Sequence, residues 1–266
     1  MRVGIARPAP LGECLVTGPG TRRLPLLGVF TAAALVSCPP LLIPQLAGAA
    51  ALETADLREA STQVAARLAE SAGRWTIVGV GAGDRRFGPD TLGSFVGFGA
   101  DVRVGLGGRG GTAVDPDLPL PILIGGWLRG ACPGEVVADG LVVASDAAPE
   151  QCADMGADLR KQLDADAEPH GVLVVADGAN TLTAKAPGAF DERAPQVQAA
   201  LDGALGAGDL EYLRQLDPAQ CESLGIEGRA AWQVLAGLFG EAPGRTTTLY
   251  QGAPFGVAYH VGTWLP

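Results

Sequence analysis

The chain has few residues of several kinds on which catalysis and binding commonly depend. Its 266 residues include two histidines, His170 and His260, two lysines, Lys161 and Lys185, and 5% aromatic residues. Two imidazoles are too few for a metal site built mainly from histidine. Basic residues number 19 against 29 acidic ones, which gives a net charge of -10. A nucleic-acid surface needs clustered lysine and arginine, so we expect no nucleic-acid partner.

Paired cysteines with metal-ligand or redox spacing are also missing. The five cysteines are scattered and form no CxxC motif: Cys14, Cys38, Cys132, Cys152 and Cys221. Their spacing excludes a zinc ribbon and a thioredoxin-like redox site. Free thiols are typical of a reducing compartment, so the sequence predicts a cytoplasmic protein. The apolar run before Cys38 is too short to span a bilayer, and we expect no membrane partner unless Cys38 carries a lipid.

The N-terminal part of the chain has two interpretations. Residues 1–23 are rich in glycine, proline and arginine, and we expect them to form a tail outside the fold. The apolar run at 24–38 ends in Leu35-Val-Ser-Cys38, which is similar to the lipobox of exported lipoproteins acylated at cysteine. The same run fits the first buried strand of an α/β domain, stopped by Pro39-Pro40. Residues 39–46 stay apolar where a lipoprotein usually has a polar tether, which favours the strand.

Beyond residue 38, strand patterns and helix patterns alternate. We predict helices at 52–72, in the later part of 118–129, and at 149–165, 191–205, 209–215 and 230–239. We predict strands at 75–80, 101–106, 141–145, 171–176, 246–251 and 256–264, the last two as an antiparallel pair. This order predicts one α/β domain over 24–266. It has three layers, with a mixed, mostly parallel central sheet flanked by helices.

Polar residues follow several of the predicted strands, where open α/β sheets bind their ligands. They are Ser37-Cys38, Gly83-Asp84 and Asp177-Gly-Ala-Asn180, joined by Glu227 before a helix. Common motifs do not explain them, because Gly79 to Gly83 lacks the GxGxxG spacing and no serine lies in a GxSxG elbow. Each also has a structural interpretation: a buried thiol at Cys38, an Asx-type turn at Asp177, and a helix N-terminal carboxylate at Glu227.

Four segments occur in an order that is more distinctive than any one of them. They are Cys38-Pro-Pro-Leu-Leu-Ile-Pro-Gln-Leu46, Val172-Leu-Val-Val-Ala-Asp-Gly-Ala-Asn180, Ala186-Pro-Gly-Ala-Phe-Asp191 and Glu227-Gly-Arg-Ala-Ala-Trp-Gln-Val-Leu-Ala-Gly237. Over about 24–264 the chain resembles the beta-subunit type of the class III extradiol ring-cleavage dioxygenases, whose relatives include the Memo-type proteins. The resemblance implies a three-layer α/β fold, a non-haem ferrous ion (Fe2+) that binds a catechol and dioxygen, and a homo-oligomer.

The resemblance also implies a site whose ligands are altered. The family's first histidine ligand corresponds to Cys38, and near the second only Asp84 could coordinate a metal. Glu227 corresponds to the third ligand, so the implied metal site is Cys38, Asp84 and Glu227. The loop that carries the family's acid/base histidine reads Asp177 to Thr181 here. Its candidate catalytic residues are Asp177 and Asn180, of which only Asp177 can exchange a proton near neutral pH.

Three functions remain open from the sequence. In the first, the protein is an extradiol dioxygenase-like enzyme that transforms a small aromatic molecule with a divalent metal, and Asp177 is the base. In the second, the same scaffold has lost its metal and binds a small molecule or a partner without turnover. In the third, the protein is an exported lipoprotein acylated at Cys38.

Overall fold

The computed structural model describes residues 30–107 and 113–266, and it confirms an α/β fold of three layers. The main sheet has seven strands in the order β3-β7-β2-β8-β1-β10-β9. Their bounds are β1 Phe30–Val36, β2 Arg74–Gly81, β3 Arg85–Phe87, β7 Val137–Ala144, β8 His170–Val175, β9 Arg245–Gly252 and β10 Tyr259–Leu265. The four middle strands, β7, β2, β8 and β1, are parallel, whereas β3, β10 and β9 pair antiparallel.

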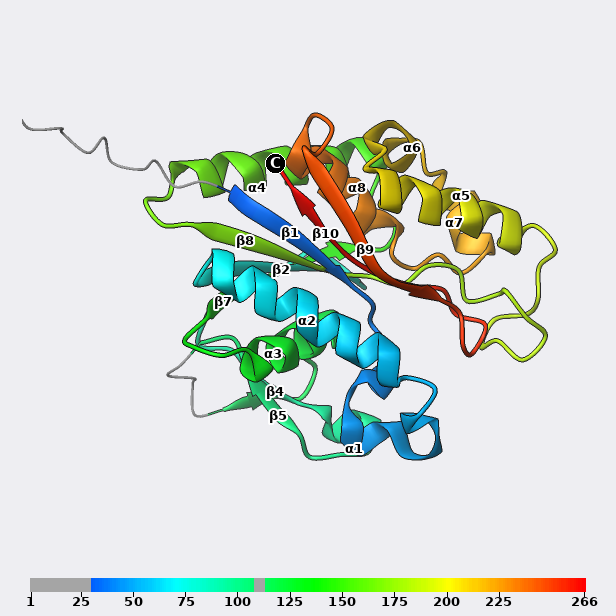
Figure 1. Ribbon diagram of the computed structural model, residues 1–266, viewed down its shortest axis with the longest axis horizontal. Coiled ribbons are helices and arrows are strands. Elements are labelled where there is room, and N and C mark those ends of the chain that lie inside the picture. The colour runs from blue at the N-terminus through cyan, green and yellow to red at the C-terminus, as the bar shows by residue number, and fades with distance from the viewer. Residues whose placement is uncertain (1–29, 108–112) are drawn as a thin grey trace, which may run out of the picture.

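Helices cover both faces of the main sheet (Figure 1). One face carries α1 Pro44–Ala47, α2 Ala55–Ser71 and α3 Leu120–Ala131. The other carries α4 Pro149–Ala165, α5 Ala194–Ala207, α6 Leu210–Arg214, α7 Pro218–Ser223 and α8 Arg229–Phe239. The two faces bury separate hydrophobic clusters, because the side chains of each strand alternate between them.

The apolar run before Cys38 forms strand β1, which confirms the strand interpretation over its described residues. All of Phe30–Val36 except Thr31 is buried, and the strand lies between β8 and β10 in the interior of the sheet. A continuous apolar sequence is typical of a strand covered on both faces. Cleavage before Cys38, as in a lipoprotein, would remove this strand and split the sheet. The predicted tail at 1–23 lies outside the described residues.

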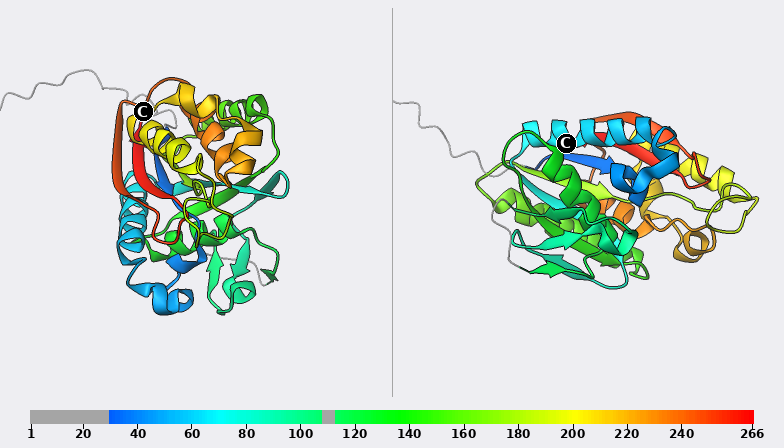
Figure 2. Two further views of the ribbon diagram at one scale, coloured as in Figure 1. Left: turned by 90° about the vertical axis from the view of Figure 1, so that its right-hand side faces the viewer. Right: turned by 90° about the horizontal axis from the view of Figure 1, so that it is seen from below.

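A second, smaller sheet was not predicted from the sequence. It contains β4 Leu92–Ser94, β5 Arg103–Gly105 and β6 Val114–Asp115 in the order β5-β4-β6 (Figure 2). Arg129 at the end of α3 holds β5 by donating from Nε to the Gly105 carbonyl at 3.0 Å. The strand predicted at 101–106 is confirmed as β5, but β4 and β6 have two or three residues and are too short to give a period-2 pattern.

Three further elements differ from the sequence expectation. Helix α3 begins at Leu120 and contains Pro121 in its first turn, where a missing N–H costs no hydrogen bond, so the proline does not delay the helix as predicted. Strand β3 and helix α7 were not predicted. The sequence Asp217-Pro218 nevertheless indicates the start of a helix. The Asp217 side chain caps α7 by accepting from the Gln220 N–H, and Pro218 occupies the first turn.

In the described residues, no helix combines the length and the apolar character that crossing a membrane requires.

Candidate functional site

A cavity of about 910 Å³ opens at the carboxyl ends of β2, β7 and β8. Helix α7 and the segments that follow β8 and precede α8 form its other walls. The residues that line it are Val80, Gly81, Ser145, Asp146, Asn180, Thr181, Gly188, Ala189, Pro218, Ala219, Cys221, Glu222, Ser223, Gly225, Ile226, Glu227 and Arg229. Its size is that of a small-molecule site, and its position is the ligand crevice of open α/β sheets.

Asp177 and Cys38 lie together at the ends of β8 and β1. The backbone N–H of Cys38 donates to Asp177 Oδ1 at 2.7 Å. Burial raises the pKa of Asp177 to about 7, and the charge of Glu227 adds to the rise while the Cys38 N–H opposes it. Burial, followed by the charges of Asp177 and Glu227, also raises the pKa of the Cys38 thiol. The thiol is therefore neutral at physiological pH, and Asp177 exchanges its proton close to neutrality.

Asn180 and Glu227 form the part of this cluster that faces the cavity. Asn180 Nδ2 donates to Glu227 Oε1 at 3.3 Å, and both residues line the cavity wall. The contact depends on Gly225, which has a φ of +64° and whose missing side chain leaves room for the Asn180 amide. A Cβ atom at Gly225 would lie 1.8 Å from Asn180 Oδ1. Any larger residue there would displace Asn180 from Glu227.

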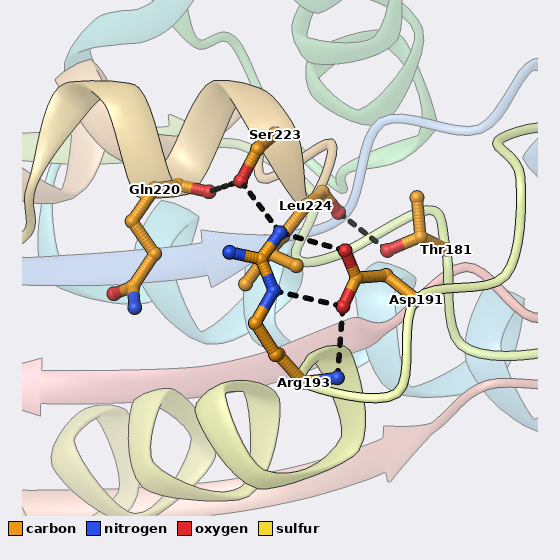
Figure 3. Close-up of polar contacts among 6 residues, drawn as sticks. All are labelled: Thr181, Asp191, Arg193, Gln220, Ser223 and Leu224. Carbon is orange, nitrogen blue, oxygen red and sulfur yellow. Dashed lines mark hydrogen bonds and ion pairs between the residues drawn. The ribbon is translucent and has the colours of Figure 1, made fainter.

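The loop after β8 is held in place by buried hydrogen bonds. The Ala179 N–H donates to Oε1 of the buried Gln198 at 2.8 Å, and the Thr181 hydroxyl donates to the Leu224 carbonyl at 2.8 Å. The Arg193 guanidinium donates to Asp191 from Nε to Oδ1 at 3.0 Å and from Nη2 to Oδ2 at 2.7 Å. Its Nη2 also donates to Ser223 Oγ at 3.3 Å (Figure 3). These contacts tie α7 to the segment 181–193 and fix that wall of the cavity.

The structure places Asp84 away from the other predicted ligands. Its Oδ1 accepts from the backbone N–H of Ala144 at 2.8 Å, and its Oδ2 accepts from Gln151 Nε2 at 3.1 Å. Both carboxylate oxygens are thus committed to the end of β7 and to α4. Asp84 does not line the cavity, where Asn180 and Glu227 lie. Its contacts are those of a residue that anchors the loop between β2 and β3.

The charge of the cavity wall is negative. Asp146, Glu222 and Glu227 contribute carboxylates, and Arg229 is the one basic residue among the lining side chains. Arg229 is buried, and its guanidinium is occupied: Nη1 donates to Gln233 Oε1 at 2.7 Å and Nη2 to the Ser145 carbonyl at 2.6 Å. This arginine fastens α8 to the end of β7. The wall therefore carries three carboxylates against one guanidinium and is negative on balance.

The donor set does not fit the ferrous ion that the family resemblance implies. Within residues 30–107 and 113–266, no three His, Cys, Asp or Glu side chains converge in an arrangement that could hold a metal ion. Cys38 is not among the residues that line the cavity. Both oxygens of Asp84 are engaged elsewhere. Glu227 alone among the three predicted ligands faces the cavity, and one carboxylate does not make a non-haem iron site.

Sequence reasoning missed three residues of the cavity wall. Asp146 follows the strand predicted at 141–145, so the strand-end rule that selected Asp177 would also have selected it. Arg229 lies two residues after Glu227 in a segment that was recognised, but the sequence gives no sign that its guanidinium turns to Ser145. Glu222 belongs to α7, which was not predicted.

Comparison with known proteins gives a likeness of fold. No profile of a known protein family matches the sequence, and no curated protein matches it. Among solved structures, an uncharacterized protein from Escherichia coli K12 superimposes with a TM-score of 0.53. The two are 12% identical, and the match covers 89% of this chain and 100% of that chain. At this identity the likeness concerns the fold alone.

Proposed function

We propose that this protein binds a small aromatic molecule in the cavity at the strand ends, that the ligand is neutral or positively charged, and that no metal takes part. The observation that carries the proposal is the lining: Asp146, Glu222 and Glu227 offer carboxylates, and the lone arginine is committed to protein acceptors. Such a wall attracts hydroxyl or ammonium donors and repels carboxylates and phosphates.

The apolar part of the lining supports an aromatic ring. Val80, Pro218 and Ile226 contribute apolar surface to the cavity wall, beside its polar side chains. Ligand sites of this size combine apolar walls with a few placed polar groups that orient the ligand. The amide of Asn180 and the carboxylate of Glu227 are a hydrogen-bonded pair at the wall, so each holds the other in position to orient a ligand hydroxyl.

Binding is tested by calorimetric titration with two catechols of opposite charge, one carrying an alkylammonium group and the other a carboxylate. The titrations contain a chelator, so that metal-dependent binding is suppressed. We expect the ammonium probe to bind at least about tenfold more tightly than the carboxylate probe, because three carboxylates face the cavity. Equal affinity for the two probes, or failure of the ammonium probe to bind, would contradict the proposal.

The variant Glu227→Gln tests the site itself. It keeps the size of the side chain and removes its charge, and we expect it to weaken the ammonium probe about tenfold, the loss of one charge-assisted hydrogen bond. Glu70→Gln is the matched control, because Glu70 is exposed on α2, outside the cavity lining. The proposal fails if both variants bind alike. Binding that appears only with added ferrous iron and brings oxygen uptake would establish the dioxygenase in its place.

A further inference from the structure

A second cavity lies at the opposite edge of the main sheet, where β2, β7 and β8 begin. Its volume is about 360 Å³. The residues that line it are Arg74, Thr76, Arg86, Phe87, Gly88, Asp139, Gly140, Leu159, Gln162, Leu163, Asp166 and His170. Helix α4 covers it, since Leu159, Gln162 and Leu163 belong to that helix. It lies at the amino ends of these strands, whereas the cavity that Glu227 lines lies at their carboxyl ends.

The strand register brings polar side chains together on the α4 face of the sheet, at the amino ends of the strands. Further along the same strands, the side chains on this face are apolar. In β2, Arg74 and Thr76 lie on the same face of the sheet as Val78, because side chains two residues apart in a strand point to the same side. Val78 is buried in the hydrophobic cluster under α4. The register places His170 of β8 opposite Arg74, and Asp139 of β7 opposite Thr76. The polar groups therefore meet across three neighbouring strands.

His170 has a ring nitrogen without a partner. The residue is 4% exposed, and its Nε2 lies 3.1 Å from the Thr76 hydroxyl. Its Nδ1 is buried and meets no hydrogen-bond partner in the described residues. The contact with Thr76 allows either tautomer of the neutral ring, and in the one where the hydroxyl donates to Nε2 the ring carries its proton on Nδ1. That N–H is a buried donor in need of an acceptor.

Two arginines add further donors. Arg74 Nε is buried and unpartnered among the described residues. The terminal nitrogens of Arg74 lie 3.9 Å from Asp139 Oδ2 and 3.9 Å from Glu168 Oε2, beyond hydrogen-bond distance. Arg86 is exposed on the edge strand β3 and forms no ion pair in the part of the chain that the structure describes.

The acceptors of the cavity do not match these donors. Asp166 Oδ1 already accepts from the backbone N–H groups of Ala167 and Glu168 at 2.7 and 3.3 Å, and these bonds lower its pKa. Asp139 makes only the long contact to Arg74. Nδ1 of His170 and Nε of Arg74, both buried and without a hydrogen-bond partner in the described residues, thus line one cavity together with the exposed Arg86.

We propose that this second cavity binds a small oxyanion, held by Arg74 and Arg86 and by the Nδ1–H of His170. Phosphate and carboxylate groups both fit this description, because their oxygens accept hydrogen bonds from several N–H groups at once. Arg74 and Arg86 share the cavity with Asp139 and Asp166, so its lining carries as many basic as acidic side chains in a chain whose net charge is -10. The inference is independent of the proposed function, because none of its residues lines the cavity at the other edge.

Calorimetric titration of the full chain at constant ionic strength tests the site, with inorganic phosphate in one arm and succinate in the other. We expect at least one of the two anions to bind saturably. The anion that binds more tightly shows whether the cavity prefers a phosphate or a carboxylate group. Arg86→Gln should weaken it about tenfold, and because Arg86 is exposed on an edge strand the variant keeps the fold. Arg67→Gln removes the same charge from an exposed position on α2 and should leave the affinity unchanged.

A spectroscopic readout separates direct contact from a general effect of charge. Addition of the anion should shift the ¹⁵N resonance of His170 Nδ1, because that N–H gains an acceptor, and should leave the resonances of His260 in place. The proposal is overturned if neither anion binds, if Arg86→Gln and Arg67→Gln reduce affinity equally, or if the anion binds without moving the Nδ1 resonance of His170.

Discussion

The variant Gly156→Ala is expected to lose about 3 kcal/mol of its free energy of unfolding. Helices α4 and α8 form the most extensive contact between two helices in the described residues, and a glycine on each helix lets their backbones approach. A Cβ atom at Gly156 would lie 2.1 Å from the Val234 carbonyl oxygen, and one at Gly237 would lie 2.1 Å from the Ala153 carbonyl oxygen. These neighbours are backbone atoms and have no rotamer to change. The helices must therefore separate.

Urea unfolding of Gly156→Ala beside Gly203→Ala provides the measurement and its matched control. Gly203 lies in the interior of α5, and a Cβ atom there would meet nothing within 4 Å. Alanine at that position should stabilise the protein by about 0.5 to 1 kcal/mol, because it restricts the unfolded chain and favours the helix. The two substitutions are chemically identical and opposite in sign. Similar effects of both would show that the α4–α8 contact is not close-packed.

The second large effect is a change in how stability depends on pH in Asp177→Asn. The pKa of this carboxyl is about 7 in the folded protein against an ordinary value of 3.8. The folded state therefore holds the proton more tightly than the unfolded state does. Below about pH 4 both states are protonated and the group costs no stability. As the pH rises from about 4 to about 7, the unfolded state loses its proton first and stability falls.

Asparagine at position 177 removes this penalty and retains the acceptor for the Cys38 N–H. We expect Asp177→Asn to match the parent protein at pH 4 and to be more stable by about 2 to 4 kcal/mol at pH 8, where the buried charge beside Glu227 is absent. Urea unfolding at pH 4, 6 and 8 measures the difference. Asp90→Asn is the control, because it makes the same substitution at an exposed carboxyl outside the cavity lining. Parallel stability curves for Asp177→Asn and its parent would contradict the prediction.

A carboxyl group that costs stability at neutral pH fits a site better than a purely structural role. Asp177 accepts from the Cys38 N–H and is affected by the charge of Glu227, which lines the strand-end cavity. Proteins commonly tolerate such unfavourable groups at positions used for ligands. If Asp177→Asn is more stable and binds the ammonium probe less well, stability and binding compete at this residue.

The sequence by itself determined the long strands and helices of the main layers. The apolar runs at 30–36 and 170–175 are covered on both faces, and their composition shows it without reference to any other part of the chain. The amphipathic pattern of 149–165 predicts a helix for the same local reason. Because parallel strands end at a common edge, the sequence also placed Asp177, Asn180 and Cys38 at one edge of the sheet.

Only the tertiary structure decided what these residues touch. Asp84 follows a strand just as Asp177 does, yet it binds Ala144 and Gln151 because β7 and α4 lie beside it. Asn180 reaches Glu227 only because Gly225 leaves room for its amide. The polar groups around His170 meet through the register of three strands that are far apart along the chain. Local patterns depend on consecutive residues, whereas such contacts depend on strand order and on packing between distant segments, which no single stretch of sequence contains.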